Sequence, residues 1–70
     1  MSISEALYET MRFCSSKNLE FRLITGGPDK NSYIIDQENK IVTITIIDEK
    51  DIELDGVINN KLLELKDIFK

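Results

Sequence analysis

The alternation of apolar and polar residues is most regular over residues 32–47, where two runs rich in β-branched residues flank a short polar stretch. This pattern predicts a β-hairpin. The polar stretch suits a three-residue loop, residues 37–39, with Asn39 in the left-handed conformation that its short polar side chain tolerates. The residues facing each other across the hairpin are then Asp36 and Lys40, Ile35 and Ile41, and Ile34 and Val42.

This register divides the hairpin into two faces. The face assigned to the core carries Ile34, Val42, Ile44 and Ile46. The other face is only half polar, whereas the strands of a sheet covered on one side alternate more regularly between apolar and polar residues. Its contiguous apolar group predicts a surface for a partner or a second copy, with scattered surface exposure as the alternative. The residues of this predicted interface are Tyr33, Ile35, Ile41 and Ile47.

The N-terminal stretch, residues 2–17, predicts a helix. Ser2 and Glu5 fit a capping box, and Asn18 is a suitable left-handed stop. The apolar stripe of this helix consists of Ile3, Leu7, Met11 and Cys14. Residues 19–25 then predict a first strand, and the Gly-rich residues 25–31 a plain connector, because phosphate-binding loops lead into a helix rather than a strand.

The C-terminal third predicts a short strand and a second helix. Residues 51–55 alternate strictly, so Ile52 and Leu54 suit a fourth strand at a sheet edge with an acidic outer side. Residues 56–70 follow a helical period, with Asp55 as the candidate N-cap. The apolar stripe of this helix consists of Ile58, Leu62, Leu65 and Phe69.

Together these elements predict one small α+β domain over residues 1–70. Its order is a helix, an antiparallel meander of three strands, extended to four if residues 51–55 pair, and a C-terminal helix. Both helices are expected on one sheet face, and the alternative is one helix on each face. The predicted core is Ile3, Leu7, Met11, Phe21, Leu23, Ile34, Val42, Ile44, Ile46, Leu54, Ile58, Leu62, Leu65 and Phe69.

Charge is unevenly distributed along the chain. The net charge is −4, from 13 acidic and 9 basic residues. Residues 48–55 hold five acids against Lys50 alone, and the remainder of the chain is neutral. A basic patch for direct nucleic-acid binding is therefore disfavoured, and a basic protein surface is the expected partner. The acidic residues of this candidate binding segment are Asp48, Glu49, Asp51, Glu53 and Asp55.

Part of this acidic segment resembles the first half of an EF-hand calcium loop. Residues 51–56 read D-I-E-L-D-G. The likeness then fails, because the twelfth loop position, where a bidentate acid belongs, is Leu62. An acidic edge strand followed by a helix cap accounts for the same residues. A weakly calcium-responsive module remains a third hypothesis, but no metal ligand is assigned.

Catalysis is not expected, because the chain has no histidine and the acids lie on a predicted exposed strand. A single cysteine, Cys14, excludes an internal disulfide, argues against a structural zinc site and favours a reducing compartment. The start of the chain lacks the features of a signal peptide, and no apolar run is long enough to span a membrane. The expectation is a cytoplasmic protein without a cofactor.

The sequence thus favours a non-enzymatic protein-binding module. In its most specific form, it inhibits or modulates a larger protein by placing carboxylates on a basic, nucleic-acid-binding surface. The alternative is a self-associating structural or accessory protein that dimerises through the predicted Tyr33, Ile35 and Ile41 face.

Overall fold

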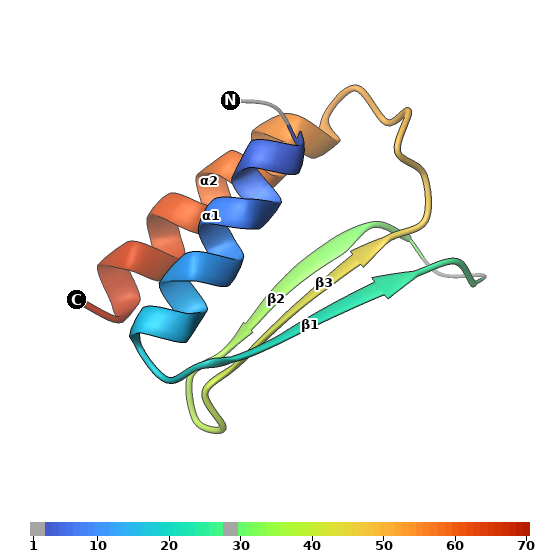
Figure 1. Ribbon diagram of the computed structural model, residues 1–70. Helices are drawn as coiled ribbons and strands as arrows, with labels where there is room; N and C mark the ends of the chain where they lie inside the picture. The colour runs from blue at the N-terminus through green and yellow to red at the C-terminus, as the bar shows by residue number, and fades with distance from the viewer. Residues whose placement is uncertain (1–2, 28–29) are drawn as a thin grey trace.

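The chain folds into two layers, with two helices side by side on one face of a three-stranded sheet (Figure 1). This computed structural model describes residues 3–27 and 30–70, and only the backbone of residue 3. The elements in chain order are α1 (Ile3–Ser16), β1 (Glu20–Thr25), β2 (Ser32–Asp36), β3 (Ile41–Ile46) and α2 (Leu54–Ile68). The α+β class and the shared helix face are confirmed, while the predicted Ser2 cap lies outside the described residues.

The strand order is β1-β3-β2, so the predicted meander is wrong. β3 occupies the centre, antiparallel to β2 and parallel to β1. The most apolar strand therefore pairs on both sides, and its inward residues Val42, Ile44 and Ile46 are all buried. The meander prediction assumed that strands adjacent in sequence also pair, but β1 and β2 occupy opposite edges.

The hairpin between β2 and β3 has a four-residue turn, not the predicted loop of three. Asp36 pairs with Ile41, and Ile35 pairs with Val42. The left-handed residue is Lys40, with φ 57°, rather than Asn39. Asn39 instead donates hydrogen bonds to the Asp36 carboxylate from its backbone N–H, at 3.1 Å, and from its side chain, at 2.9 Å.

This one-residue difference in register exchanges the two faces of β2, because side chains alternate with a period of two. Tyr33 and Ile35 face the helices, and Tyr33 is only 5% exposed. Ile34, predicted to lie in the core, is 57% exposed on the opposite face. The predicted position of Tyr33 and Ile35 on the face away from the core is therefore wrong.

Residues 51–55 do not form a fourth strand. Residues 51–53 make a turn, and α2 begins at Leu54, with Glu53 rather than Asp55 as the N-cap. Leu54 is buried as the first member of the stripe that continues with Ile58, Leu62 and Leu65. Leu54 is helical rather than part of a strand because it extends the long apolar face of α2. Ile52, the other apolar residue of the predicted strand, is 95% exposed.

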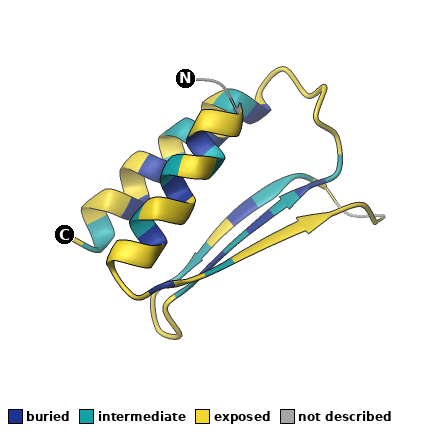
Figure 2. Cartoon of the chain, viewed as in Figure 1, coloured by how far each residue is buried: buried dark blue, intermediate teal, exposed yellow. Residues whose placement is uncertain are grey.

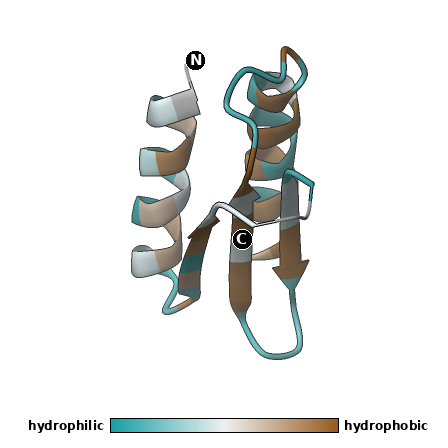
Figure 3. Ribbon diagram, turned by 90° about the vertical axis from the view of Figure 1, so that its right-hand side faces the viewer, coloured by the Kyte–Doolittle hydropathy of each residue, from teal (hydrophilic) through white to brown (hydrophobic). Residues whose placement is uncertain are grey.

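The core lies between the helices and β3, and Figure 2 shows its dark-blue positions on their facing sides. α1 turns Ala6, Thr10 and Cys14 inward, and the predicted left-handed residue Asn18, with a φ of 58°, lies just after its C-terminal end. The predicted core was wrong for Met11 and Leu23, each 46% exposed. Figure 1 and Figure 3 show the reason: α1 lies in the helix layer and is offset past β1, the edge strand, so it covers this strand only in part.

Candidate functional site

The acidic segment, residues 48–55, forms the connection between β3 and α2 and the first turn of α2 (Figure 1). Asp48, Glu49, Asp51 and Glu53 are exposed, and Asp55 is half-buried. The segment is therefore an exposed loop, where the sequence predicted a sheet edge. All five predicted acidic residues still lie in this one continuous segment.

Three of these carboxylates hold the segment in shape. Asp48 accepts a hydrogen bond from the backbone N–H of Lys50 at 2.9 Å, and Asp51 accepts one from the N–H of Glu53 at 2.9 Å. Asp55 accepts a hydrogen bond from the Asn59 side chain at 3.1 Å. The contacts of Asp48 and Asp51 with nearby backbone amides define turns, whereas the contact of Asp55 lies within α2. The loop is therefore locally ordered by its own acids.

The side chains of Glu49 and Glu53 make no hydrogen bond or ion pair with any residue that the structure describes. Bases elsewhere on the surface contact acids close to them in sequence. These ion pairs are Arg12–Glu9, Arg22–Glu20, Lys61–Glu64 and Lys70–Asp67. The negative charge of the acidic segment therefore has no such cationic partner within the described chain.

Asn31 fastens the start of the acidic segment to the beginning of β2. Its side-chain oxygen accepts hydrogen bonds from the N–H groups of Ile47, at 2.6 Å, and Asp48, at 2.9 Å. Its side-chain nitrogen donates to the carbonyl of Asp48 at 2.8 Å. Sequence reasoning missed this residue, because its partners are 16 and 17 positions away.

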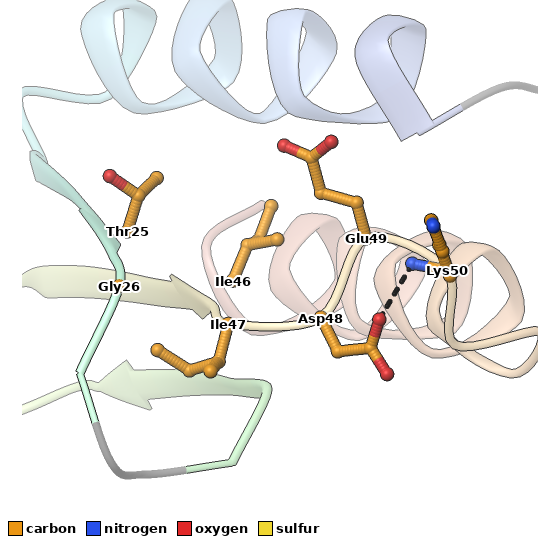
Figure 4. A pocket seen from close by; sticks show the side chains of 7 residues that line it. All are labelled: Thr25, Gly26, Ile46, Ile47, Asp48, Glu49 and Lys50. Carbon is orange, nitrogen blue, oxygen red and sulfur yellow. Dashed lines mark hydrogen bonds between the residues drawn. The ribbon is translucent and has the colours of Figure 1, made fainter.

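An open hollow of about 540 Å³ lies between the ends of β1 and β3 and the start of the acidic segment. In Figure 4, Thr25, Ile46 and Glu49 point toward α1, and Ile47 points to the opposite side of the sheet. Ile46 and Glu49 also line a neighbouring hollow of about 270 Å³ with Ser4 and Leu7. Glu49 thus stands at the mouth between α1 and the sheet.

The described residues bring no three metal-binding side chains together. Asp51 and Asp55 are engaged in separate local bonds, so the EF-hand likeness of the acidic segment has no geometric support. Cys14 is buried, and burial raises the pKa of its thiol. A buried thiol without an activating partner is a packing residue rather than a nucleophile.

The open face of the sheet is the second candidate surface. Ile41 and Ile47 lie on this face, as the sequence predicted, and both are half-buried (Figure 4 shows Ile47). Ile34 and Ile24, which the sequence did not assign to an interface, are the more exposed apolar residues of this face. The cause is the register change in β2 and the absence of a helix on this side (Figure 3).

Comparison with known proteins gives no match to a family model, to a curated protein or to a solved structure. None of the described helices is both long and apolar enough to cross a bilayer.

Proposed function

We propose that the protein is a small cytoplasmic binding module without catalytic activity, which docks through residues 48–55 on a basic surface of a larger protein. The observation that supports this is the acidic segment itself, with five carboxylates in one stretch, four of them on exposed residues, and no ion pair to a described residue. The free thiol of Cys14 agrees with a reducing compartment.

The order of the segment supports a binding role as well. Asp48, Asp51 and Asn31 hold the loop with hydrogen bonds, so less conformational entropy is lost when a partner contacts it. Glu49 and Glu53 are left with their charges available. A basic surface that otherwise contacts phosphates is the partner that such carboxylates complement best, and occupying it inhibits or modulates nucleic-acid binding.

The deciding experiment neutralises only the two carboxylates that hold nothing in place. A Glu49→Gln/Glu53→Gln variant removes two charges and leaves the Asp48 and Asp51 turns intact. The matched control, Glu9→Gln/Glu64→Gln, removes two charges from the outer helix surfaces. Each protein is immobilised and used to capture partners from a cell lysate.

The proposal predicts that the wild-type protein and the control capture the same basic proteins, that raised salt or added nucleic acid displaces them, and that the Glu49/Glu53 variant loses them. Salt sensitivity follows from the screening of exposed charges. Equal capture by all three proteins would show that the acidic segment is not the binding site.

Self-association through the open sheet face is the second candidate, favoured by the 57% exposure of Ile34. The face is small, however. Three strands about 4.8 Å apart and about 20 Å long present roughly 300 Å², whereas a stable interface buries about 800 Å² per partner. This candidate therefore predicts only weak association, seen as a concentration-dependent mass in sedimentation and lost in Ile34→Thr.

A further inference from the structure

The outer edge of β1 has a free row of backbone hydrogen-bonding groups. The N–H of Glu20 donates to the Lys40 carbonyl at 2.9 Å, so the backbone groups of Glu20 point toward β3. Because these groups alternate in direction along a strand, those of Phe21, Leu23 and Thr25 point away from β3. Among the described residues, no strand pairs with this side of β1.

The helix layer is wider than the sheet. Three strands about 4.8 Å apart place the two edge strands only about 10 Å from each other, whereas each helix is itself about 10 Å across. α1 therefore extends beyond β1, as Figure 3 shows with α1 beside the strand. We call the strip beside β1, on the side away from β3 and flanked by α1, the β1 lane.

Exposed apolar side chains lie on both elements beside the β1 lane, and on α1 the position of Met11 is one turn after Leu7, which lines a hollow with Ile46 of the sheet. Met11 on α1 and Leu23 on the helix-facing side of β1 are each 46% exposed, and Ile24 on the open face is 48% exposed. Edge strands are often protected from pairing by a bulge, a proline, charged side chains or a covering element. β1 has only Glu20 and Arg22, and these two are paired with each other.

We propose that an extended segment of another protein adds to β1 as a fourth strand and fills the β1 lane. Its backbone would bond to the outward groups of Phe21, Leu23 and Thr25. Its side chains would be apolar at alternate positions, where they would contact Met11 and Leu23. Strand addition of this kind takes affinity from main-chain hydrogen bonds and specificity from alternate side chains.

The end of the β1 lane gives the segment a second chemical feature. Thr25 and Gly26 line the same hollow as Asp48 and Glu49. A basic residue of the added strand at this end would lie beside carboxylates (Figure 4). This part of the inference rests on the proposed function of the acidic segment, while pairing with β1 does not.

A second copy of this chain does not fit the lane. Two copies joined two-fold through β1 would each bring α1 over the same strip, because α1 extends past the strand it accompanies (Figure 3). A single extended strand lies in the plane of the sheet and leaves α1 in place above it. The occupant is therefore a segment of a different protein.

A display library of random twelve-residue peptides, selected against the full chain, tests the proposal. Enriched peptides should show apolar residues at alternate positions and a basic residue at one end. Titration of the isotope-labelled protein with a synthetic enriched peptide should shift the amide resonances of Phe21, Leu23 and Thr25 most. Enrichment of no peptide, or shifts centred on another surface, would overturn the proposal.

Variants separate the β1 lane from the acidic segment. Leu23→Pro removes an outward N–H at an edge position, where proline is tolerated, and Met11→Glu places a charge at an exposed position of α1 and leaves the sequence of β1 unchanged. Each should weaken peptide affinity at least about tenfold, because each removes one side of a strand-addition site. Leu63→Thr, at an exposed apolar position of α2, is the control and should bind as the wild type does.

Met11→Glu keeps the test decisive if Leu23→Pro does not fold. Unchanged peptide affinity in Met11→Glu would overturn the proposed strand addition to β1. Pairing of two copies of the chain through β1 at high concentration would also overturn it. Glu49→Gln/Glu53→Gln should weaken only peptides with a basic end. If that variant binds these peptides normally while Met11→Glu does not, the proposed role of the acidic segment is refuted and the proposed strand addition to β1 is supported.

Discussion

The phenol of Tyr33 donates a hydrogen bond to the hydroxyl of Thr10 at 3.3 Å in the interior of the protein. Thr10 in turn donates to the carbonyl of Ala6 at 2.8 Å. Both side chains are buried, so this short chain of hydroxyl groups joins the edge strand β2 to α1 through the core. It exists only because the hairpin register turns Tyr33 inward.

The two hydroxyl groups should contribute unequally to stability. Tyr33→Phe leaves Thr10 bonded to Ala6, and it removes a long bond, so a cost of about 0.5–1 kcal/mol is expected. Thr10→Val leaves the buried phenol of Tyr33 without its acceptor and should cost about 1–3 kcal/mol. Urea unfolding of both variants measures the difference, and the reverse order would contradict it.

Stability should fall between pH 10 and pH 12. Burial raises the pKa of Tyr33 to about 12, and the hydrogen bond to Thr10 opposes this rise. Below the ordinary tyrosine pKa of about 10, the phenol is neutral in both states. Above it, the unfolded chain releases the proton and the folded protein keeps it, so the unfolded state is favoured.

Urea midpoints measured across this pH range in the wild type and in Tyr33→Phe test the assignment. The Tyr33→Phe variant should lose less stability over this interval. Tyr8→Phe, at an exposed position, should behave as the wild type does. An identical pH dependence in all three proteins would show that the titration of Tyr33 is not coupled to folding.

Cys14 should react with thiol reagents only when the fold opens. Its side chain is buried, and burial raises the pKa of the thiol, which keeps it protonated as well as inaccessible. The labelling rate, relative to that of an exposed thiol, should fall roughly to the unfolded fraction, which is about 10⁻³ to 10⁻⁴ for a stability near 5 kcal/mol. A Cys14→Ala/Ser15→Cys variant, with the thiol at an exposed site, should label rapidly in the native state.

Lys40→Gly should stabilise the protein by about 0.5–1 kcal/mol, because a left-handed backbone disfavours residues with a Cβ. The φ of Lys40 is 57°. Lys40→Gln removes the charge without this relief and serves as the control. Asn39→Gly should instead destabilise the hairpin, since Asn39 bonds to Asp36 through its side chain. Thermal unfolding measures both effects. A three-residue loop with Asn39 in the left-handed conformation would instead make Asn39→Gly stabilising.

Asn31→Ala should loosen the acidic segment without changing its charge. The variant loses hydrogen bonds to Ile47 and Asp48, at an expected cost of about 1–3 kcal/mol. Hydrogen exchange at the amides of those two residues should accelerate, and capture of a basic partner should weaken. Asn60→Ala, on the exposed surface of α2, is the control and should leave both measurements unchanged.

Local sequence patterns were sufficient for the elements but not for the way they pair. The two helices, three strands and the stop at Asn18 follow from nearby residues, and the structure confirms them. The acidic segment was equally visible as a run of charges. Its shape was not, because a strand and a helix start both explain an inward Leu54, and only packing of the whole α2 stripe decides between them.

By itself, the sequence determined an α+β chain with an isoleucine-rich hairpin and its negative charge gathered at residues 48–55. Only the tertiary structure decided that β1 joins β3 in parallel, that Tyr33 rather than Ile34 faces the helices, and that α1 extends past the sheet. The reason is physical. Strand order and register depend on partners far away in the chain, and a shift of one residue exchanges the two faces of a strand.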